Sequence, residues 1–135
     1  MSKRQTLALQ AGLIVIGGLG YNLLELLWRG RTHWSMFLVG GLCFRLIGGI
    51  GSRLYRRSRL LCGVACAAAV TAVELVSGCI VNLWWGLKVW DYSGMRFHLK
   101  GQVCLAYSLL WMLLSLAVYP LYGLCRRGLC RQLRA

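Results

Sequence analysis

Acidic residues are almost absent from this chain. Its 135 residues include 16 Lys and Arg but only three acids, Glu25, Glu74 and Asp91, so the formal net charge is +13. Proline occurs once, at Pro120. Hydrophobic residues make up 59% of the chain, more than a soluble domain of this length could shield from water. The composition predicts a membrane protein in which an acid inside an apolar segment is a candidate functional residue.

The usual signatures of catalytic and cofactor sites are also missing. The sequence has no G-x-S-x-G, H-E-x-x-H, Walker A or dinucleotide-binding glycine motif, so we predict no catalytic residue, no cofactor and no enzyme activity. The seven cysteines lack CxxC spacing and have no histidine close in sequence, which argues against a metal site. The cations flank apolar segments instead of covering a soluble domain, so no nucleic-acid partner is expected.

Four apolar stretches reach the roughly 20 residues that cross a bilayer as a helix. They span about residues 6–28, 36–53, 60–83 and 101–124. A chain in lipid must satisfy its backbone hydrogen bonds internally, so all four are predicted to be helices. We expect an all-α integral membrane protein, a four-transmembrane-helix bundle that forms a single domain over residues 1–135. Two parallel helix-hairpin repeats remain an open alternative.

Cations are unevenly distributed among the connections, and their distribution predicts an orientation. If both termini are cytoplasmic, the bias is about two to one in favour of the inner side. The inner group contains Lys3, Arg4, Arg53, Arg56, Arg57, Arg59, Arg126, Arg127, Arg131 and Arg134, and the outer group contains Arg29, Arg31, Lys88, Arg96 and Lys100. We therefore expect a multi-pass protein of the plasma membrane, of the bacterial inner-membrane type, whose inner cations attract anionic lipids at the cytoplasmic face.

Two opposite charges fall at matching depths of the second and third predicted helices. Arg45 lies about nine residues from the outer start of one helix, and Glu74 about ten from the outer end of the next. Thr71, Glu74 and Asn82 are spaced so that they share one helix face. We predict a Glu74–Arg45 ion pair, which either fixes helix register or lines a polar pathway for a proton, an ion or a headgroup.

Two further groups of polar residues lie nearer the predicted outer surface. On the first helix, Asn22 and Glu25 are one turn apart, and Arg29 follows as an interfacial partner for Glu25. In the third connection, Trp90, Asp91, Tyr92 and Ser93 form one cluster with the sequence W-D-Y-S. Asp91 can accept hydrogen bonds from Ser93 in a turn, so this cluster is interpreted as an interfacial turn or as a lid over a cavity lined by Glu74.

The run from Glu74 to Trp111 resembles the CmpB-like, or ABC-transporter type IV, family of membrane proteins. The shared pattern is a glutamate followed by a glycine, W-D-Y-S, then G-x-x-C-L at residues 101–105, and a serine and tryptophan in the returning helix. The first half of the chain differs because it lacks the proline-rich loop of that family. The resemblance implies a small permease that works as a homo-oligomer or with a partner ATPase or other membrane subunit.

Three functions are compatible with the sequence. The leading hypothesis is a transport-related or channel-like homo-oligomer with a buried Glu/Arg site. The second is a membrane scaffold or accessory subunit whose buried charges specify assembly. The third is an intramembrane enzyme that acts on a lipid headgroup through Asp91, Glu25, His33 and His98, which would require these groups to approach within about 3 Å of the substrate or of one bridging water.

Overall fold

Four apolar helices dominate the computed structural model, which describes all 135 residues and is 77% helical. Each is long and apolar enough to cross a membrane: Lys3–Arg29, Trp34–Leu54, Arg59–Trp84 and Leu105–Arg134. The only strands are two residues each. The predicted all-α membrane fold class is therefore confirmed, whereas the orientation of the termini and the two-repeat arrangement stay predictions.

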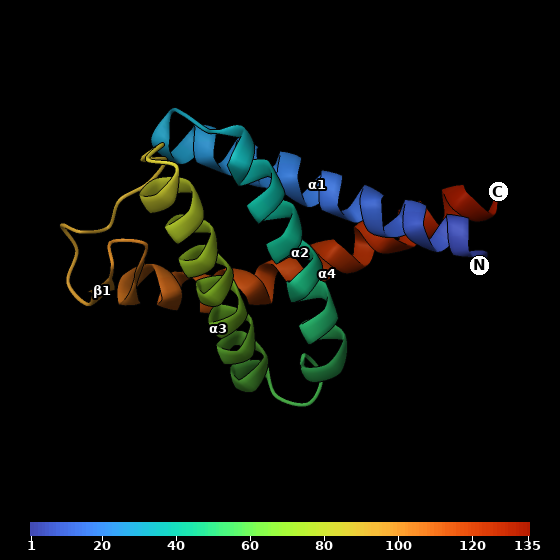
Figure 1. Cartoon of the computed structure of the whole chain (residues 1–135). Helices are drawn as coiled ribbons and strands as arrows, with labels where there is room; N and C mark the ends of the chain where they lie inside the picture. The colour runs from blue at the N-terminus through green and yellow to red at the C-terminus, as the bar shows by residue number, and fades with distance from the viewer. The chain divides into compact units, whose positions relative to one another are not determined.

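Figure 1 labels the four helices α1 to α4 and the strand β1. The bounds of all elements are α1 Lys3–Arg29, α2 Trp34–Leu54, α3 Arg59–Gly78, η1 Cys79–Trp84, β1 His98–Leu99, β2 Val103–Cys104 and α4 Leu105–Arg134. The strands form one antiparallel pair, with His98 opposite Cys104 and Leu99 opposite Val103. The segment η1 is a π-helix that directly continues α3.

Local sequence explains where the first and third helices begin and end. Ser2 caps α1 by accepting a hydrogen bond from the Gln5 backbone N–H, while the Gln5 side chain accepts from the Ser2 N–H. Gly30 ends that helix in the left-handed region, at φ 72°, where a residue without Cβ is favoured. Ser58 caps α3 by accepting from the Leu61 N–H.

The fourth helix differs at both ends from the predicted span of residues 101–124. It begins at Leu105, because Gly101 adopts φ 69° and Val103–Cys104 pairs with β1, so this stretch cannot be helical. It continues to Arg134, well into the basic tail, where hydropathy no longer indicates a span. The third predicted helix, residues 60–83, corresponds to α3 together with η1.

The chain divides into two compact units. Unit 1 comprises Met1–Gly49 and Ala117–Ala135, and unit 2 comprises Ile50–Leu116. The helices α2 and α4 therefore each contribute residues to both units. The organisation of residues 1–135 as a single membrane domain stays a prediction.

In unit 1, glycines bring helix backbones close to neighbouring side chains. A Cβ added to Gly17 would lie 2.4 Å from the Phe44 side chain, and one added to Gly40 would lie 2.4 Å from Tyr21. Glycine is thus required where α1 and α2 approach, as is usual for helices packed in lipid. A Cβ at Gly48 of α2 would come within 2.1 Å of the Tyr122 ring of α4.

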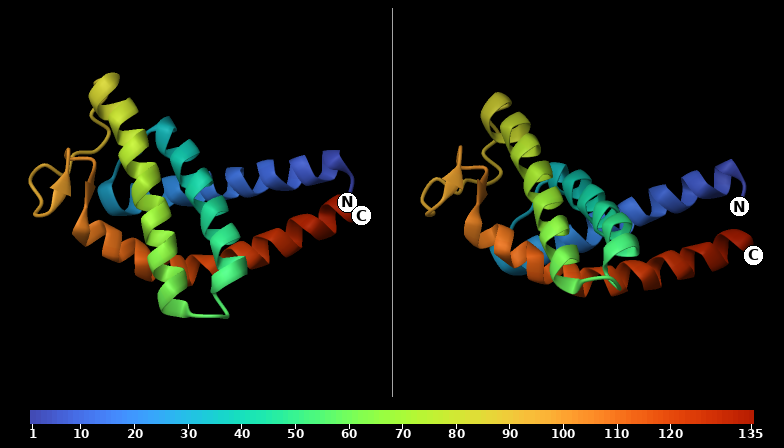
Figure 2. Two further views of the ribbon diagram at one scale, coloured as in Figure 1. Left: turned by 60° about the horizontal axis from the view of Figure 1, so that its bottom comes forward. Right: turned by 90° about the horizontal axis from the view of Figure 1, so that it is seen from below.

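Helix α1 and the last part of α4 pack together in the same unit. Leu9, Leu13 and Tyr122 form a buried hydrophobic cluster, against which Leu129 and Leu133 pack. The Gln5 amide Nε2 donates to the Leu133 carbonyl at 2.8 Å. The two chain ends consequently lie side by side, as both views of Figure 2 show.

In unit 2, α3 packs against the first turns of α4. Cys62, Cys66 and Val70 of α3 are fully buried. A Cβ on Gly63 would lie 3.0 Å from the Met112 side chain, so the helices are close here as well. This packing determines which residues of α3 lie opposite which residues of α4, and therefore which α4 residues Glu74 can contact.

Candidate functional site

Glu74 is the buried acid of unit 2. It lies on α3 with 5% of its surface exposed, and its Oε1 accepts a hydrogen bond from the Trp111 indole Nε1 at 2.8 Å. An indole N–H can only donate, and a carboxyl oxygen accepts whether the acid is neutral or charged. The Trp111 contact can therefore hold Glu74 in place in either protonation state.

The polar face predicted on α3 is directed at polar residues of α4. Thr71 and Ser108 share a hydrogen bond of 2.7 Å between their hydroxyl oxygens, one helical turn from the Glu74–Trp111 contact. Ser115, farther along α4, donates to the Trp111 carbonyl at 2.6 Å. Burial of hydroxyl and carboxyl groups in an apolar layer is costly unless they are paired. The Thr71–Ser108 and Glu74–Trp111 hydrogen bonds provide this pairing, and both join α3 to α4.

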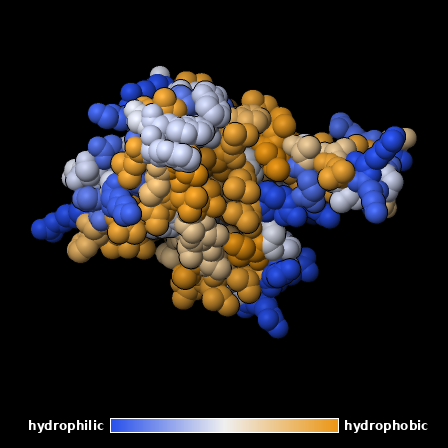
Figure 3. Space-filling view, viewed as in Figure 1, coloured by the Kyte–Doolittle hydropathy of each residue, from blue (hydrophilic) through white to orange (hydrophobic).

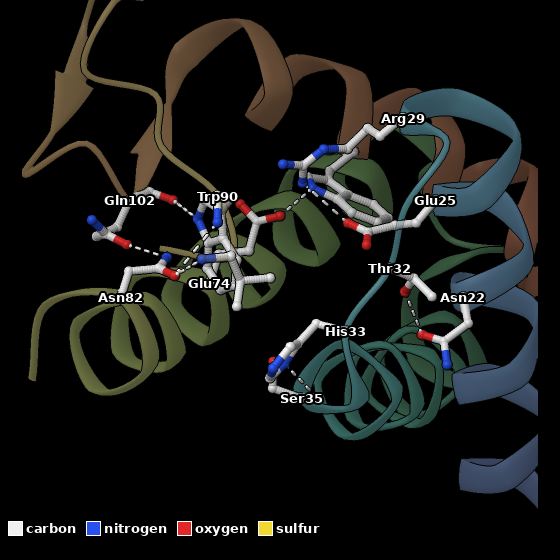
Figure 4. Close-up of polar contacts among 12 residues, drawn as sticks. Asn22, Glu25, Arg29, Thr32, His33, Ser35, Glu74, Asn82, Trp90 and Gln102 are labelled. Atoms are coloured by element: carbon white, nitrogen blue, oxygen red, sulfur yellow. Dashed lines mark hydrogen bonds and ion pairs between the residues drawn. The ribbon is translucent and has the colours of Figure 1, made fainter. Parts of the chain in front are cut away.

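Asn82 occupies the centre of the second polar group, in the π-helix η1. Its Nδ2 donates to Gln102 Oε1 at 2.8 Å, and its Oδ1 accepts from the backbone N–H groups of Val89 at 2.6 Å and Trp90 at 3.4 Å (Figure 4). π-Helical segments are rare and are often found at functional positions. The side chain thus ties the end of the third span to the connection that follows it.

Gln102 and Trp90 complete this anchor. The Trp90 indole donates to the Gln102 carbonyl at 2.9 Å, and Gln102 Nε2 donates to the Lys100 carbonyl at 2.9 Å. All three anchor side chains are buried, Trp90 at 3%, Gln102 at 2% and Asn82 at 6% exposed. A Cβ on Gly78 would lie 2.4 Å from Gln102 Oε1, so only glycine fits beneath them.

Sequence reasoning missed Gln102 as a partner of Asn82. The available signal was a second amide at the start of an apolar segment, where an unpaired polar side chain is costly. The sequence marks Trp111 and Ser108 only through the family resemblance, and not as partners of Glu74 and Thr71. Helical spacing thus indicates the face of α3 but not the residues opposite it.

The W-D-Y-S cluster is an ordered turn next to this anchor. Asp91 Oδ1 accepts from the Ser93 N–H at 2.9 Å, which confirms the predicted turn. Hydrogen bonds from Ser93 lower the pKa of the Asp91 carboxyl, and the charges of His98 and Lys88 lower it further. Asp91 itself is exposed to solvent.

Backbone geometry in the same connection is unusual. Tyr92 stacks on Tyr107 with ring centroids 4.9 Å apart, and its N–H donates to the Gly101 carbonyl at 2.7 Å. Three non-glycine residues of this connection adopt the left-handed backbone region, with φ between 51° and 54°: Lys88, Phe97 and Lys100. Such conformations cost on the order of 1 kcal/mol or more each and persist only where the surroundings enforce them. The anchor holds the peptide groups that follow two of them, through the Val89 N–H and the Lys100 carbonyl. The role of the loop as a lid stays a prediction.

In unit 1, the predicted interfacial pair is present. Arg29 Nη1 lies 3.3 Å from Glu25 Oε1, one turn along α1, and Glu25 is 6% exposed. Asn22 Oδ1 accepts from the Thr32 hydroxyl at 3.1 Å, which links the end of α1 to the connection before α2. Glu25 and Asn22 thus anchor the last turns of α1.

Arg45 has a partner that the sequence did not indicate. Its Nε donates to Gln10 Oε1, so an amide of α1 holds the guanidinium of α2. Arg45 belongs to unit 1 and Glu74 to unit 2, and the ion pair between them stays a prediction.

The two histidines have local structural contacts. His33 Nδ1 lies 2.7 Å from the Ser35 hydroxyl near the start of α2. His98 Nδ1 accepts from the Gly101 N–H at 3.0 Å within the strand turn. Each ring therefore stabilises the turn in which it lies.

Comparison with known families shows that one family model covers most of the chain. A family model described as Putative ABC-transporter type IV matches residues 13–133, which extends the resemblance seen at residues 74–111 over the first two helices as well. No curated protein and no solved structure matches the chain.

Proposed function

The chain belongs to the Putative ABC-transporter type IV family and is a multi-pass, transport-related membrane protein, and on that premise we propose that Glu74 is the central group of its transport pathway. In this proposal Glu74 responds to a proton or cation, and Arg45 is its counter-charge. Thr71 and Asn82 extend the polar path along the third span, and Asn22 and Glu25 are its proposed polar residues on α1. Residues Trp90 to Ser93 cover the outer mouth.

One observation carries the proposal, the buried Glu74 carboxyl held by Trp111 Nε1 at 2.8 Å. An acid in an apolar span is expensive and is usually retained for a functional reason. The indole contact positions the carboxyl without fixing its protonation state. The Trp111 contact is thus compatible with either protonation state of Glu74, as a proton-responsive site requires.

The proposal also includes an assembly. Four helices are few for a translocation path, so we propose a homo-oligomer that works with a partner ATPase or another membrane subunit. The connection between α2 and α3 is the proposed cytoplasmic contact, and Arg59 at the start of α3 lies over the ring of Tyr55 in this connection, at 4.5 Å. The proposed location is the plasma membrane with both termini cytoplasmic, and no chemical catalysis is part of the proposed function.

The test replaces Glu74 by glutamine and measures proton flux in proteoliposomes. A trapped pH-sensitive dye would report flux driven by an imposed membrane potential. The amide of Glu74→Gln keeps a carbonyl oxygen for Trp111, so the fold should be retained while pH-dependent flux is lost. Ser77→Ala is the matched control, because Ser77 lies one turn away on α3 and donates only to the Val73 carbonyl of its own helix. Full flux in Glu74→Gln would refute the proposal.

A second candidate is an assembly subunit that transports nothing itself. Every buried side-chain nitrogen and oxygen has a hydrogen-bond partner, which is what charges and amides that only specify packing would need. This candidate predicts that Arg45→Gln, added to Glu74→Gln, restores oligomerisation and the activity of a partner. Wild-type protein would then conduct no protons in the dye assay.

A further inference from the structure

The last turns of α4 extend past the length that a bilayer core requires. A helix of 30 residues at about 1.5 Å per residue is longer than the roughly 30 Å hydrocarbon layer. The long apolar stretch ends at Leu124, and Arg126, Arg127, Arg131 and Arg134 follow within ten residues. These arginines therefore begin where the hydrocarbon of one leaflet gives way to its headgroups.

This end of α4 packs against α1. Tyr122 and Leu129 pack with the core residues Leu9 and Leu13, and Gln5 donates to the Leu133 carbonyl. A Cβ added to Gly12 would lie 3.1 Å from Leu129, so the two helices are in close contact. Helix α1 therefore covers one side of α4 over its last turns.

Another side of α4 carries a regular pattern. Leu124, Arg127, Arg131 and Arg134 are spaced by three, four and three residues, so they share one helix face, which we call the arginine face. All four are exposed, Leu124 at 59%, and Leu121 beside them is exposed at 57%. The face thus changes from apolar to cationic along the helix axis.

No acidic residue of unit 1 lies near these charges. Lys3 and Arg4 of the adjoining first turn of α1 are also exposed, and the only acid of the unit, Glu25, lies near the other end of α1 in its pair with Arg29. Hydrophilic residues gather over the end of unit 1 where both termini lie (Figure 3). No Asp or Glu side chain of unit 1 therefore neutralises the arginine face.

We propose that the arginine face binds an anionic phospholipid of the leaflet next to the chain ends. Leu121 and Leu124 contact an acyl chain, and Arg127 and Arg131 bind the phosphate. Side chains four residues apart on a helix have Cβ atoms about 6 Å apart, so two guanidinium groups can reach one phosphate. Guanidinium binds phosphate oxygens in a bidentate manner, which an ammonium cannot do.

The order of residues favours a lipid over an acidic protein surface. A protein partner would need only the charges, whereas this face continues without a break into exposed leucines of the membrane-spanning part. A phospholipid has the same order of apolar chain and anionic head. Lipid binding at this face is independent of the transport role proposed for Glu74, which lies in the other unit.

The test measures lipid binding to the purified full chain by native mass spectrometry. Short-chain phosphatidylglycerol and phosphatidylcholine would be titrated separately into the micelle. Each cation near an anionic surface strengthens binding about fivefold, so the variant Arg127→Gln/Arg131→Gln/Arg134→Gln should bind phosphatidylglycerol on the order of 100-fold more weakly. Its affinity for phosphatidylcholine should fall much less, because choline already neutralises the phosphate of that lipid. A parallel titration followed by lipid fluorescence in 1 M salt, where the Debye length is about 3 Å, should show almost no difference between the two lipids.

A control with the same net charge separates this face from general electrostatics. Arg31→Gln/Lys88→Gln/Arg96→Gln removes three exposed cations outside the arginine face and should keep the preference for phosphatidylglycerol. Circular dichroism would verify the helices of both variants. Equal losses in the two variants, or no preference in the wild-type protein, would overturn the proposal. So would unchanged lipid binding in the arginine-face variant combined with loss of an acidic protein partner.

Discussion

Replacement of Asn82 by alanine should release the loop that follows η1. The change removes the hydrogen bonds to Gln102 at 2.8 Å and from the Val89 N–H at 2.6 Å, and a longer one from Trp90. Each of the two shorter bonds contributes about 1 kcal/mol net, and the buried Gln102 oxygen left without its donor costs at least about 1 kcal/mol more. The loop should therefore open more easily by about 3 kcal/mol, or on the order of 100-fold in its opening equilibrium.

The thiol of Cys104 reports that opening. Cys104 lies in β2, outside the spans, and is 2% exposed, so a water-soluble maleimide should react with it only when the hairpin opens. The measurement uses a variant that retains this cysteine alone. When reclosing is faster than labelling, the labelling rate follows the population of the open form.

The control is Asn22→Ala, which removes the hydrogen bond to Thr32 in unit 1 and should leave Cys104 labelling unchanged. An acceleration below about threefold in Asn82→Ala, with helix content intact, would show that this side chain does not hold the loop. That outcome would contradict the magnitude expected for buried hydrogen bonds.

Two further predictions concern the same connection. Gly78→Ala should also accelerate Cys104 labelling and lower thermal stability, because the added Cβ would lie 2.4 Å from Gln102 Oε1. The control is Gly20→Ala, whose Cβ would have nothing within 4 Å, so thermal stability should stay the same or rise. Because the pKa of Asp91 is lowered in the folded loop, its charge stabilises the turn above the unfolded-state pKa, and that contribution is lost as pH falls through the folded-state pKa. Hydrogen exchange of residues 90–104, corrected for intrinsic rates, should rise below about pH 4. Asp91→Asn, which keeps an acceptor, should lack this pH dependence.

The helices could be predicted closely because hydrophobic length alone determines a membrane span. The third prediction, residues 60–83, agrees with Arg59–Trp84. The end of α4 at Arg134 could not be predicted from hydropathy, since its last turns are helical through packing of Leu129 and Leu133 on α1. The start of α4 depends on the left-handed backbone of Gly101, which sequence periodicity does not report.

For the candidate site, the sequence predicted the polar residues of α3 and the Asp91 turn, but not the distant residues that α3 and η1 contact. Helical spacing placed Thr71 and Glu74 on one face, and local turn chemistry indicated the Asp91–Ser93 contact. Their long-range partners could not be identified from spacing, because Trp111 lies 37 residues from Glu74 and Gln102 lies 20 residues from Asn82. Such pairs depend on the way α3 and η1 meet the start of α4, which only the folded structure supplies.

The composition of unit 1 has a consequence for synthesis of the protein. Its core joins Leu9 and Leu13, near the start of the chain, to Tyr122, near the end. During translation α1 and α2 can pack through their glycines, but the α1 surface that packs on α4 lacks this partner until α4 has emerged. Loop-closure entropy makes such distant contacts slow to form. Until then lipid, or an insertion factor, must cover the α1 surface on which the last helix finally packs.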